Sequence, residues 1–185
     1  MRLESLNIEQ VENIYNERMS VDFPADEIRP LTIILSTIEK GMCDCYGLYD
    51  GNELIGYAFL LKKDNNFMID YLAISPEYRN KGIGAKMLKM LKEHYADADT
   101  VLLEVEDPDK AETDEDRDLQ SRRRAFYLRN GCTDTRLRMK CFQVPFQILV
   151  LGNSKCRDID SLRELYVSFY RMILPKEVFE RNIAE

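Results

Sequence analysis

The chain has 185 residues, of which 45 % are hydrophobic and 32 % are charged, values that exclude a disordered, collagen-like or coiled-coil protein. Its 26 basic and 33 acidic residues give a net charge of −7 without a long basic tract, which argues against nucleic-acid binding through phosphates. The amino-terminal residues lack an apolar run, and no uncharged stretch approaches ~20 residues. The sequence therefore predicts a cytoplasmic protein without a secretory signal or a membrane contact.

The first half of the chain predicts two helices and a group of strands. After a short strand at 2–6, apolar residues take helical spacing from Ile8, which Asn7 can cap, and a second apolar stripe runs over 31–38. Three short apolar runs follow, and an Asp-Gly turn signal joins the first two. These runs predict an antiparallel meander of strands at 45–49, 54–61 and 67–74.

The second half predicts a β-α-β unit and then a helical tail. Apolar residues four apart from Ile83 to Tyr95 indicate a helix, and such a crossover makes the strands at 67–74 and 101–105 parallel neighbours. The later predicted elements are a helix at 119–130 ended by Gly131, strands at 135–142 and 146–151, and a helical tail from Asp158 that Pro175 interrupts. The predicted fold class is α+β with a mixed sheet. Residues 1–151 form the domain, and 152–185 form a helical extension packed on that domain or on a subunit partner.

The five cysteines and the single histidine, His94, offer too few grouped ligands for a zinc site, because no C-x-x-C pair occurs. Cysteines in a reducing cytoplasm stay free, and free thiols are usually buried. We therefore predict no metal site and a set of free, buried thiols at Cys43, Cys45, Cys132, Cys141 and Cys156.

The chemistry concentrates at residues 79–85, R-N-K-G-I-G-A, between a predicted strand and an amphipathic helix. A helix start gathers unpaired backbone N–H groups, and Gly82 and Gly84 let an anion approach them, so a phosphate or pyrophosphate is the expected ligand. The segment lacks the G-x-x-x-x-G-K-[ST] order of a P-loop and the third glycine of the dinucleotide fingerprint. It fits the pattern R/Q-x-x-G-x-G/A through Arg79, Gly82 and Gly84; the alternative is that both glycines only serve a tight turn.

This segment, with the strand before it and the helix after it, closely resembles the pyrophosphate-binding motif of the GCN5-related N-acetyltransferases, the GNAT superfamily. A second block, R-A-F-Y-L-R-N-G-C at 124–132, resembles that family's A-x-x-F-Y-x-x-x-G-F segment. The order of elements also matches, so the resemblance covers roughly residues 1–151. It implies a GNAT fold, in which an antiparallel meander precedes a β-α-β unit whose central strands splay apart.

The resemblance implies acetyl-CoA as cofactor and direct transfer of its acetyl group to a primary amine. In the family, the cofactor lies where the strands matching 67–74 and 101–105 separate. Backbone groups of Leu72, Ala73 and Ile74 would pair with the pantetheine amides. The pyrophosphate would be bound by residues of the loop and helix start: Arg79, Asn80, Lys81, Gly82, Ile83, Gly84 and Ala85.

Tyr127 matches the family's frequent general acid, which protonates the departing CoA thiolate; the alternative is that it packs with Phe126 in the core. Many relatives carry asparagine seven residues earlier, where this chain has Gln120, whose longer amide would share the helix face of Tyr127 and could reach the cofactor. Cys132 replaces the phenylalanine that usually follows the motif's glycine. No histidine partner marks Cys132 as a nucleophile.

The general base is open among three carboxylates, because the acceptor ammonium must lose a proton before it attacks. Asp70 lies on the first of the two splayed strands, and Glu104 and Glu106 lie at the end of the second, on one face by alternation. Glu104 is the first candidate. For each of the three, a solvated or structural carboxylate is the alternative.

Two charged segments have open roles. Residues 104–118 carry nine carboxylates, which either attract a cationic amine or form a solvated loop before a helix with a negative first turn. The Arg122-Arg123-Arg124 run either contacts the 3′-phosphate of CoA or pairs with Asp118 one turn earlier.

Other classes of function also stay open at this point. A non-catalytic acyl-CoA sensor would keep the loop at 79–84 without turning over an amine, and a protein-interaction module would use the helical tail. The acceptor is a small-molecule amine or a protein amine, and the chain could form a homodimer.

Overall fold

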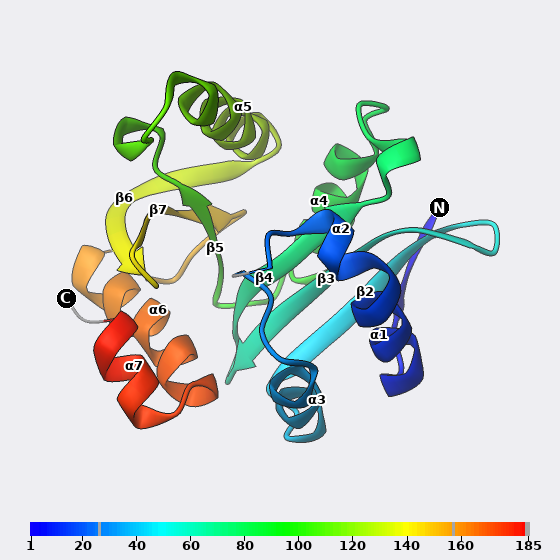
Figure 1. Cartoon of the computed structure of the whole chain (residues 1–185), viewed down its shortest axis with the longest axis horizontal. Coiled ribbons are helices and arrows are strands. Elements are labelled where there is room, and N and C mark those ends of the chain that lie inside the picture. Colours follow the sequence, from blue (N-terminus) through cyan, green and yellow to red (C-terminus); the bar gives the residue numbers. More distant parts are fainter. Residues whose placement is uncertain (26, 157, 184–185) are drawn as a thin grey trace. The chain divides into compact units, whose positions relative to one another are not determined.

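The computed structural model describes residues 1–25, 27–156 and 158–183, which fall into two compact units (Figure 1). One unit contains Met1–Lys62 and Ile69–Met90. The other contains Lys63–Met68 and the described part of Leu91–Glu185.

The first unit is built on four strands that neighbour one another in chain order: β1 (Arg2–Ser5), β2 (Cys43–Asp50), β3 (Glu53–Lys63) and β4 (Asn66–Ile74). β2 pairs antiparallel with β1 and with β3, in a register that runs from Cys43 opposite Leu61 to Asp50 opposite Glu53. Gly51, at φ +58°, turns the chain between β2 and β3, so the predicted Asp-Gly hairpin is confirmed.

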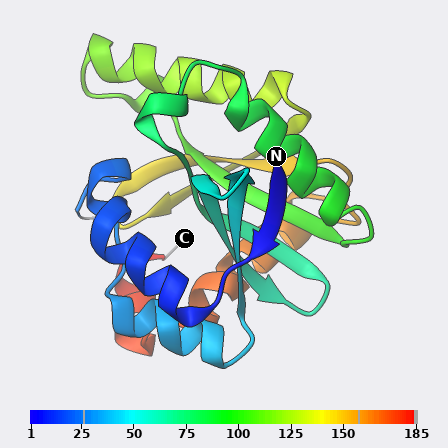
Figure 2. The same cartoon turned by 90° about the vertical axis from the view of Figure 1, so that its right-hand side faces the viewer.

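The helices of the first unit are α1 (Ile8–Ile14), α2 (Ser20–Asp22), α3 (Leu31–Glu39) and the first part of α4 (Ile83–His94), with a π-helical stretch at Tyr15–Met19. Asn7 caps α1 as predicted, since its side chain accepts the Gln10 N–H at 2.9 Å and the Gln10 side chain returns the contact. α1 and α3 lie on the same side of the strands (Figures 1 and 2). They pack on alternate strand residues: Cys43, Cys45, Tyr57, Phe59, Tyr71 and Ala73.

The second unit contains three antiparallel strands in the order β5-β7-β6: β5 (Thr100–Glu106), β6 (Cys132–Cys141) and β7 (Val144–Leu151). The predicted start of β6 at 135 is wrong by three residues, because Gly131, at φ +92°, turns the chain straight from the preceding helix into the strand. The β6–β7 turn uses Phe142 and Gln143, both at positive φ (48° and 69°), which ordinary turn signals do not mark.

The helices of the second unit are α5 (Asp114–Arg129), α6 (Ile159–Ile173) and α7 (Lys176–Asn182). The predicted start of α5 at 119 is wrong by five residues, because the Thr113 side chain accepts the Asp116 N–H at 3.1 Å and caps the helix earlier. Three acidic residues therefore fill the first turn, where they complement the helix dipole. In both views α5 lies on one side of β6 and β7, and α6 and α7 lie on the other (Figures 1 and 2).

The cysteines are free thiols, four of them buried and Cys156 half-buried. Over 1–25, 27–156 and 158–183, no cluster of His, Cys, Asp and Glu has an arrangement that could hold a metal ion. In the same ranges, no helix combines the length and the apolar character needed to cross a membrane.

Candidate functional site

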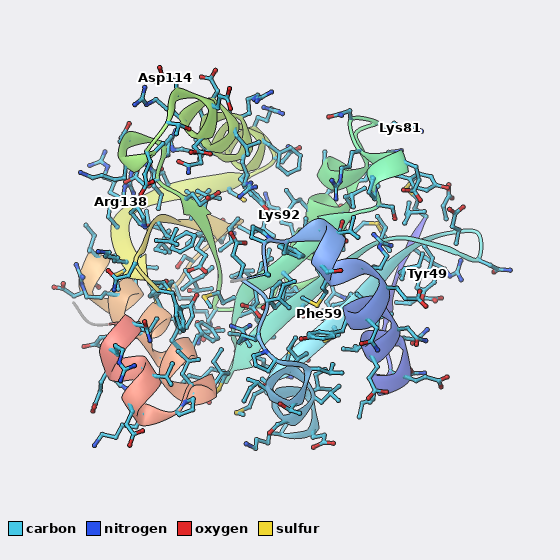
Figure 3. All side chains as sticks on the ribbon, in the orientation of Figure 1. Tyr49, Phe59, Lys81, Lys92, Asp114 and Arg138 are labelled. Atoms are coloured by element: carbon cyan, nitrogen blue, oxygen red, sulfur yellow. The ribbon has the colours of Figure 1, made fainter. Side chains whose placement is uncertain are left out.

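The loop between β4 and α4 gathers unpaired backbone donors at the surface. β4 ends at Ile74, a short 3-10 turn covers Pro76–Tyr78, and α4 begins at Ile83. The first hydrogen bond at this end of α4 runs from the Lys86 N–H to the Gly82 carbonyl at 3.2 Å, so the preceding N–H groups of the helix have no acceptor within it. Arg79 to Gly82 are exposed, and Figure 3 shows Lys81 at the start of α4. These exposed N–H groups at the start of a helix are suited to bind an anion.

Two residues of this loop adopt left-handed backbone conformations. Gly82 has φ +74°, a conformation that favours glycine. A Cβ built on it would have no heavy atom within 4 Å, so the backbone conformation, and not a lack of space, requires glycine at this position. Asn80 has φ +60°, a region that asparagine tolerates better than most residues. Gly84, by contrast, lies in the first turn of α4.

Arg79, predicted to bind the cofactor, is anchored within the first unit. Its Nε donates to the Ile74 carbonyl at 2.9 Å, and its Nη2 donates to Asp22 Oδ1 at 2.6 Å. The Asp22 side chain is 1 % exposed and also accepts from the Tyr57 hydroxyl at 3.0 Å. Burial and the Asp22 charge together raise the pKa of Tyr57, so its hydroxyl remains a donor. Arg79 therefore ties the loop to α2; the sequence has no local signal that could have identified Asp22.

Asp22→Asn is expected to lower the free energy of unfolding by about 2 kcal/mol, a fall in melting temperature of about 4–8 °C. The change removes the buried charge that Arg79, Arg18 and Tyr57 all contact. Thermal unfolding measures it. Glu180→Gln, which breaks an exposed pair with Lys176 at 3.7 Å, is the control and should leave the melting temperature within about 1 °C. Equal melting temperatures of the two variants would contradict the anchoring role.

The end of β4 is held close to β3. A Cβ on Gly56 would lie 2.7 Å from Ile74 Cδ1 and 2.9 Å from the Ala73 carbonyl oxygen, so only glycine fits beside this strand end. Gly56 was not singled out from the sequence. Of the residues expected to line the cofactor, Ala73 and Ile74 have buried side chains and Leu72 is half-buried. Asp70, one candidate base, forms an ion pair with Arg29 and is 9 % exposed at its side chain.

In the second unit, α5 carries the candidate acid. The Tyr127 ring packs edge-on against Phe126, with ring centroids 5.3 Å apart, and is half-buried. Burial raises the pKa of Tyr127 to about 12, Cys132 adds to the rise, and the Arg123 charge opposes it. The phenol is thus protonated at neutral pH, and its hydroxyl has no hydrogen-bond partner in the described ranges. Burial also raises the pKa of Cys132 to about 12, which leaves an unreactive thiol.

Gln120 carries an unsatisfied buried atom. Its Nε2 donates to Glu106 Oε1 at 3.4 Å, and its Oε1 is buried without a partner among the described residues. If the Gln120 amide were rotated by 180°, its Oε1 would face the Glu106 carboxylate oxygen, and both atoms are acceptors. The contact with Glu106 therefore fixes the orientation of the amide. A buried acceptor of this kind is rarely left unsatisfied, and an N–H donor from a ligand would complete it.

The other two candidate bases, expected on one face of the second strand, contact different helices. Glu104 accepts from the Tyr166 and Tyr170 hydroxyls of α6, at 2.8 and 2.7 Å. Glu106 pairs with Arg123 of α5 in addition to Gln120. Glu106 is the last residue of β5, and the strand keeps a regular register with β7 from Glu104 to Glu106.

The arginine run at 122–124 is occupied by protein partners. Arg122 donates to the Asp118 carbonyl and not to its carboxylate. Arg124 bonds Gln147 Oε1 at 2.6 Å and Asp134 at 2.9 Å. Hydrogen bonds from Arg138, followed by those from the Arg136 N–H and Arg124, hold the pKa of Asp134 well below its usual range. These contacts favour a structural role for the run.

Comparison with known proteins places the motifs in a family. The acetyltransferase (GNAT) family model matches residues 8–114, more than half of the chain. YjbC of Bacillus subtilis (strain 168), whose name describes it as an acetyltransferase, is 29 % identical over 113 residues, which cover 61 % of this chain and 53 % of that protein. The chain thus spans about half the length of that relative.

Solved structures agree with the fold. A GNAT-family acetyltransferase from Bacteroides thetaiotaomicron superimposes with a TM-score of 0.75 at 23 % identity, covering 94 % of this chain and 97 % of the other. An acetyltransferase from Bacillus subtilis in complex with CoA gives 0.59 at 18 % identity, covering 82 % and 98 %. The predicted α+β GNAT fold is therefore confirmed.

Proposed function

The chain belongs to the GNAT acetyltransferase family, and we propose that it transfers the acetyl group of acetyl-CoA to a primary amine by direct attack. One observation carries the proposal: the R-x-x-G-x-G loop presents the unpaired N–H groups at the start of α4, with Gly82 in a left-handed conformation and open space around it. Such a loop is suited to a pyrophosphate. CoA bound to a structural neighbour supports the same choice of ligand.

The cofactor, when bound, supplies an acetyl group activated as a thioester. In the proposal, the N–H groups from Asn80 to Ala85 bind its pyrophosphate, and Lys81 adds a positive charge. Backbone groups of Leu72, Ala73 and Ile74 pair with the pantetheine amides, and the unsatisfied Oε1 of Gln120 accepts an amide N–H. Arg79 contributes indirectly, because its hydrogen bond to Asp22 holds the loop in place.

Two side chains handle protons in this proposal. Tyr127, protonated at neutral pH, donates its proton as the thiolate leaves. Glu104 takes the proton that the acceptor ammonium gives up before it attacks. Asp70 is a weaker candidate because Arg29 occupies it, and Glu106 because Arg123 does.

Thermal unfolding with saturating acetyl-CoA, CoA, NAD and ATP in parallel tests the proposal. A ligand at ~100 times its dissociation constant adds ~2.7 kcal/mol, which raises the melting temperature of a chain of this size by about 5–10 °C. We expect a rise with acetyl-CoA and CoA only. No rise with either would refute CoA binding and leave the loop as a tight turn.

Turnover is then measured as free thiol released in the presence of a polyamine, an aminoglycoside, an amino acid or a peptide with a free amino terminus and lysine. We expect thiol release with at least one acceptor class. Tight CoA binding without release on any amine would instead favour the acyl-CoA sensor.

A further inference from the structure

The carboxyl-terminal helix α6 supplies two buried phenols to one carboxylate of β5. Tyr166 and Tyr170 are 0 % and 3 % exposed and lie one helical turn apart, with ring centroids 5.1 Å apart. Tyr166 donates to Glu104 Oε2 at 2.8 Å, and Tyr170 donates to Glu104 Oε1 at 2.7 Å. Each carboxylate oxygen therefore has its own phenol donor, from a helix beyond the segment that matches the family model.

Both phenols remain donors over the working range of pH. Burial, followed by the negative charge of Glu104, raises the pKa of Tyr166 and of Tyr170 well above the usual value. Cys141 of β6 also raises both pKa values. Hydrogen bonds from neutral donors stabilise the ionised form of a carboxylate.

The arrangement is costly if its only task is to pack α6. Two phenylalanines and an apolar residue of similar volume would fill the space without desolvating a carboxylate. Glu104 is also only half-buried, whereas both tyrosines are buried.

We propose that Tyr166 and Tyr170 are positioning residues, which hold Glu104 ionised and in one orientation so that it receives a proton from the acceptor ammonium. The proton passes from the ammonium nitrogen to a carboxylate oxygen, which leaves a neutral amine and a carboxylic acid. The inference rests on the proposed function and deepens it, because it makes α6 part of the acceptor side and selects acceptors that arrive as cations.

The test uses Tyr166→Phe, Tyr170→Phe and the double variant of the full chain. Tyr49→Phe is the matched control, since it removes a phenol that accepts from Gln10 Nε2 at 3.2 Å in the first unit. Three quantities are measured: the pH profile of kcat/KM for the best acceptor, the titration midpoint of the Glu104 carboxyl by carbon-13 NMR, and the Kd for acetyl-CoA.

Each lost phenol is expected to move the acid limb of the profile and the Glu104 midpoint up by about one pH unit, because the ionised form loses a donor. On the acid limb, at pH values below the midpoint, this lowers kcat/KM about tenfold per phenol, while Kd for acetyl-CoA stays within about twofold. Glu104→Gln should abolish the acid limb, and adding Tyr166→Phe to it should cost no further activity.

Three results would overturn the inference. They are an acid limb that stays in place in variants that still bind acetyl-CoA, an equal shift in Tyr49→Phe, and full activity of Glu104→Gln. If the double variant fails to fold, the two single variants and Glu104→Gln make the same comparison. A wild-type chain that does not bind acetyl-CoA would refute the proposed function itself, an outcome seen before any variant is compared.

Discussion

Tyr127→Phe is expected to lower kcat about 100–1,000-fold, the range that a lost general acid produces, while Kd for acetyl-CoA stays within about twofold. The substitution keeps the ring that packs on Phe126 and removes only a hydroxyl that has no hydrogen-bond partner in the described part of the chain. Folding stability should therefore change little. Stopped-flow or steady-state thiol release, together with calorimetric binding of acetyl-CoA, separates the two effects.

The pH dependence of this reaction follows from the same side chain. With a pKa of about 12, the Tyr127 phenol stays protonated as pH rises, so its deprotonation should cause no loss of kcat up to about pH 10. Full transfer to a thiolate of ordinary basicity, pKa ~8.5, would be uphill by about 3.5 units, so the transfer must accompany C–S cleavage. A Phe variant with wild-type kcat, or a basic limb near pH 8 that disappears in that variant, would contradict this role.

Gly82→Ala is expected to weaken acetyl-CoA binding about 100-fold. A Cβ at φ +74° is strained, and relief of that strain turns the neighbouring N–H groups away from the anion. Two charge-assisted hydrogen bonds, each contributing about 1.5 kcal/mol, would be lost. Isothermal titration with acetyl-CoA measures the change directly.

Gly51→Ala is the matched control for this variant. Gly51 has φ +58° and, like Gly82, open space around a built Cβ, but it lies in the β2–β3 turn. Both variants should lose about 1 kcal/mol of stability from the same backbone strain, and only Gly82→Ala should lose affinity. Equal affinities would mean that the loop serves only as a turn.

Local signals predicted much of the backbone. Asn7 caps α1, Gly51 turns the β2–β3 hairpin, and Gly131 ends α5 at positive φ, as expected. Each of these conformations depends on residues within a few positions along the chain. The errors arose where a local signal was missed or absent. Thr113 caps α5, so the helix begins earlier than its apolar residues indicate. Phe142 and Gln143 form a turn at positive φ without glycine or asparagine.

The candidate site also has features that follow from local sequence and features that depend on the fold. The sequence predicted the loop at 79–85 and placed Gln120 and Tyr127 on one face of a helix, because a glycine pattern and a helical repeat are local properties. Only the tertiary structure showed that Asp22, 57 residues before Arg79, anchors that arginine. It also showed that Tyr166 and Tyr170, 62 and 66 residues after Glu104, hold that carboxylate. The partner of a charged side chain depends on which distant segments fold beside it, and spacing along the chain carries no record of that.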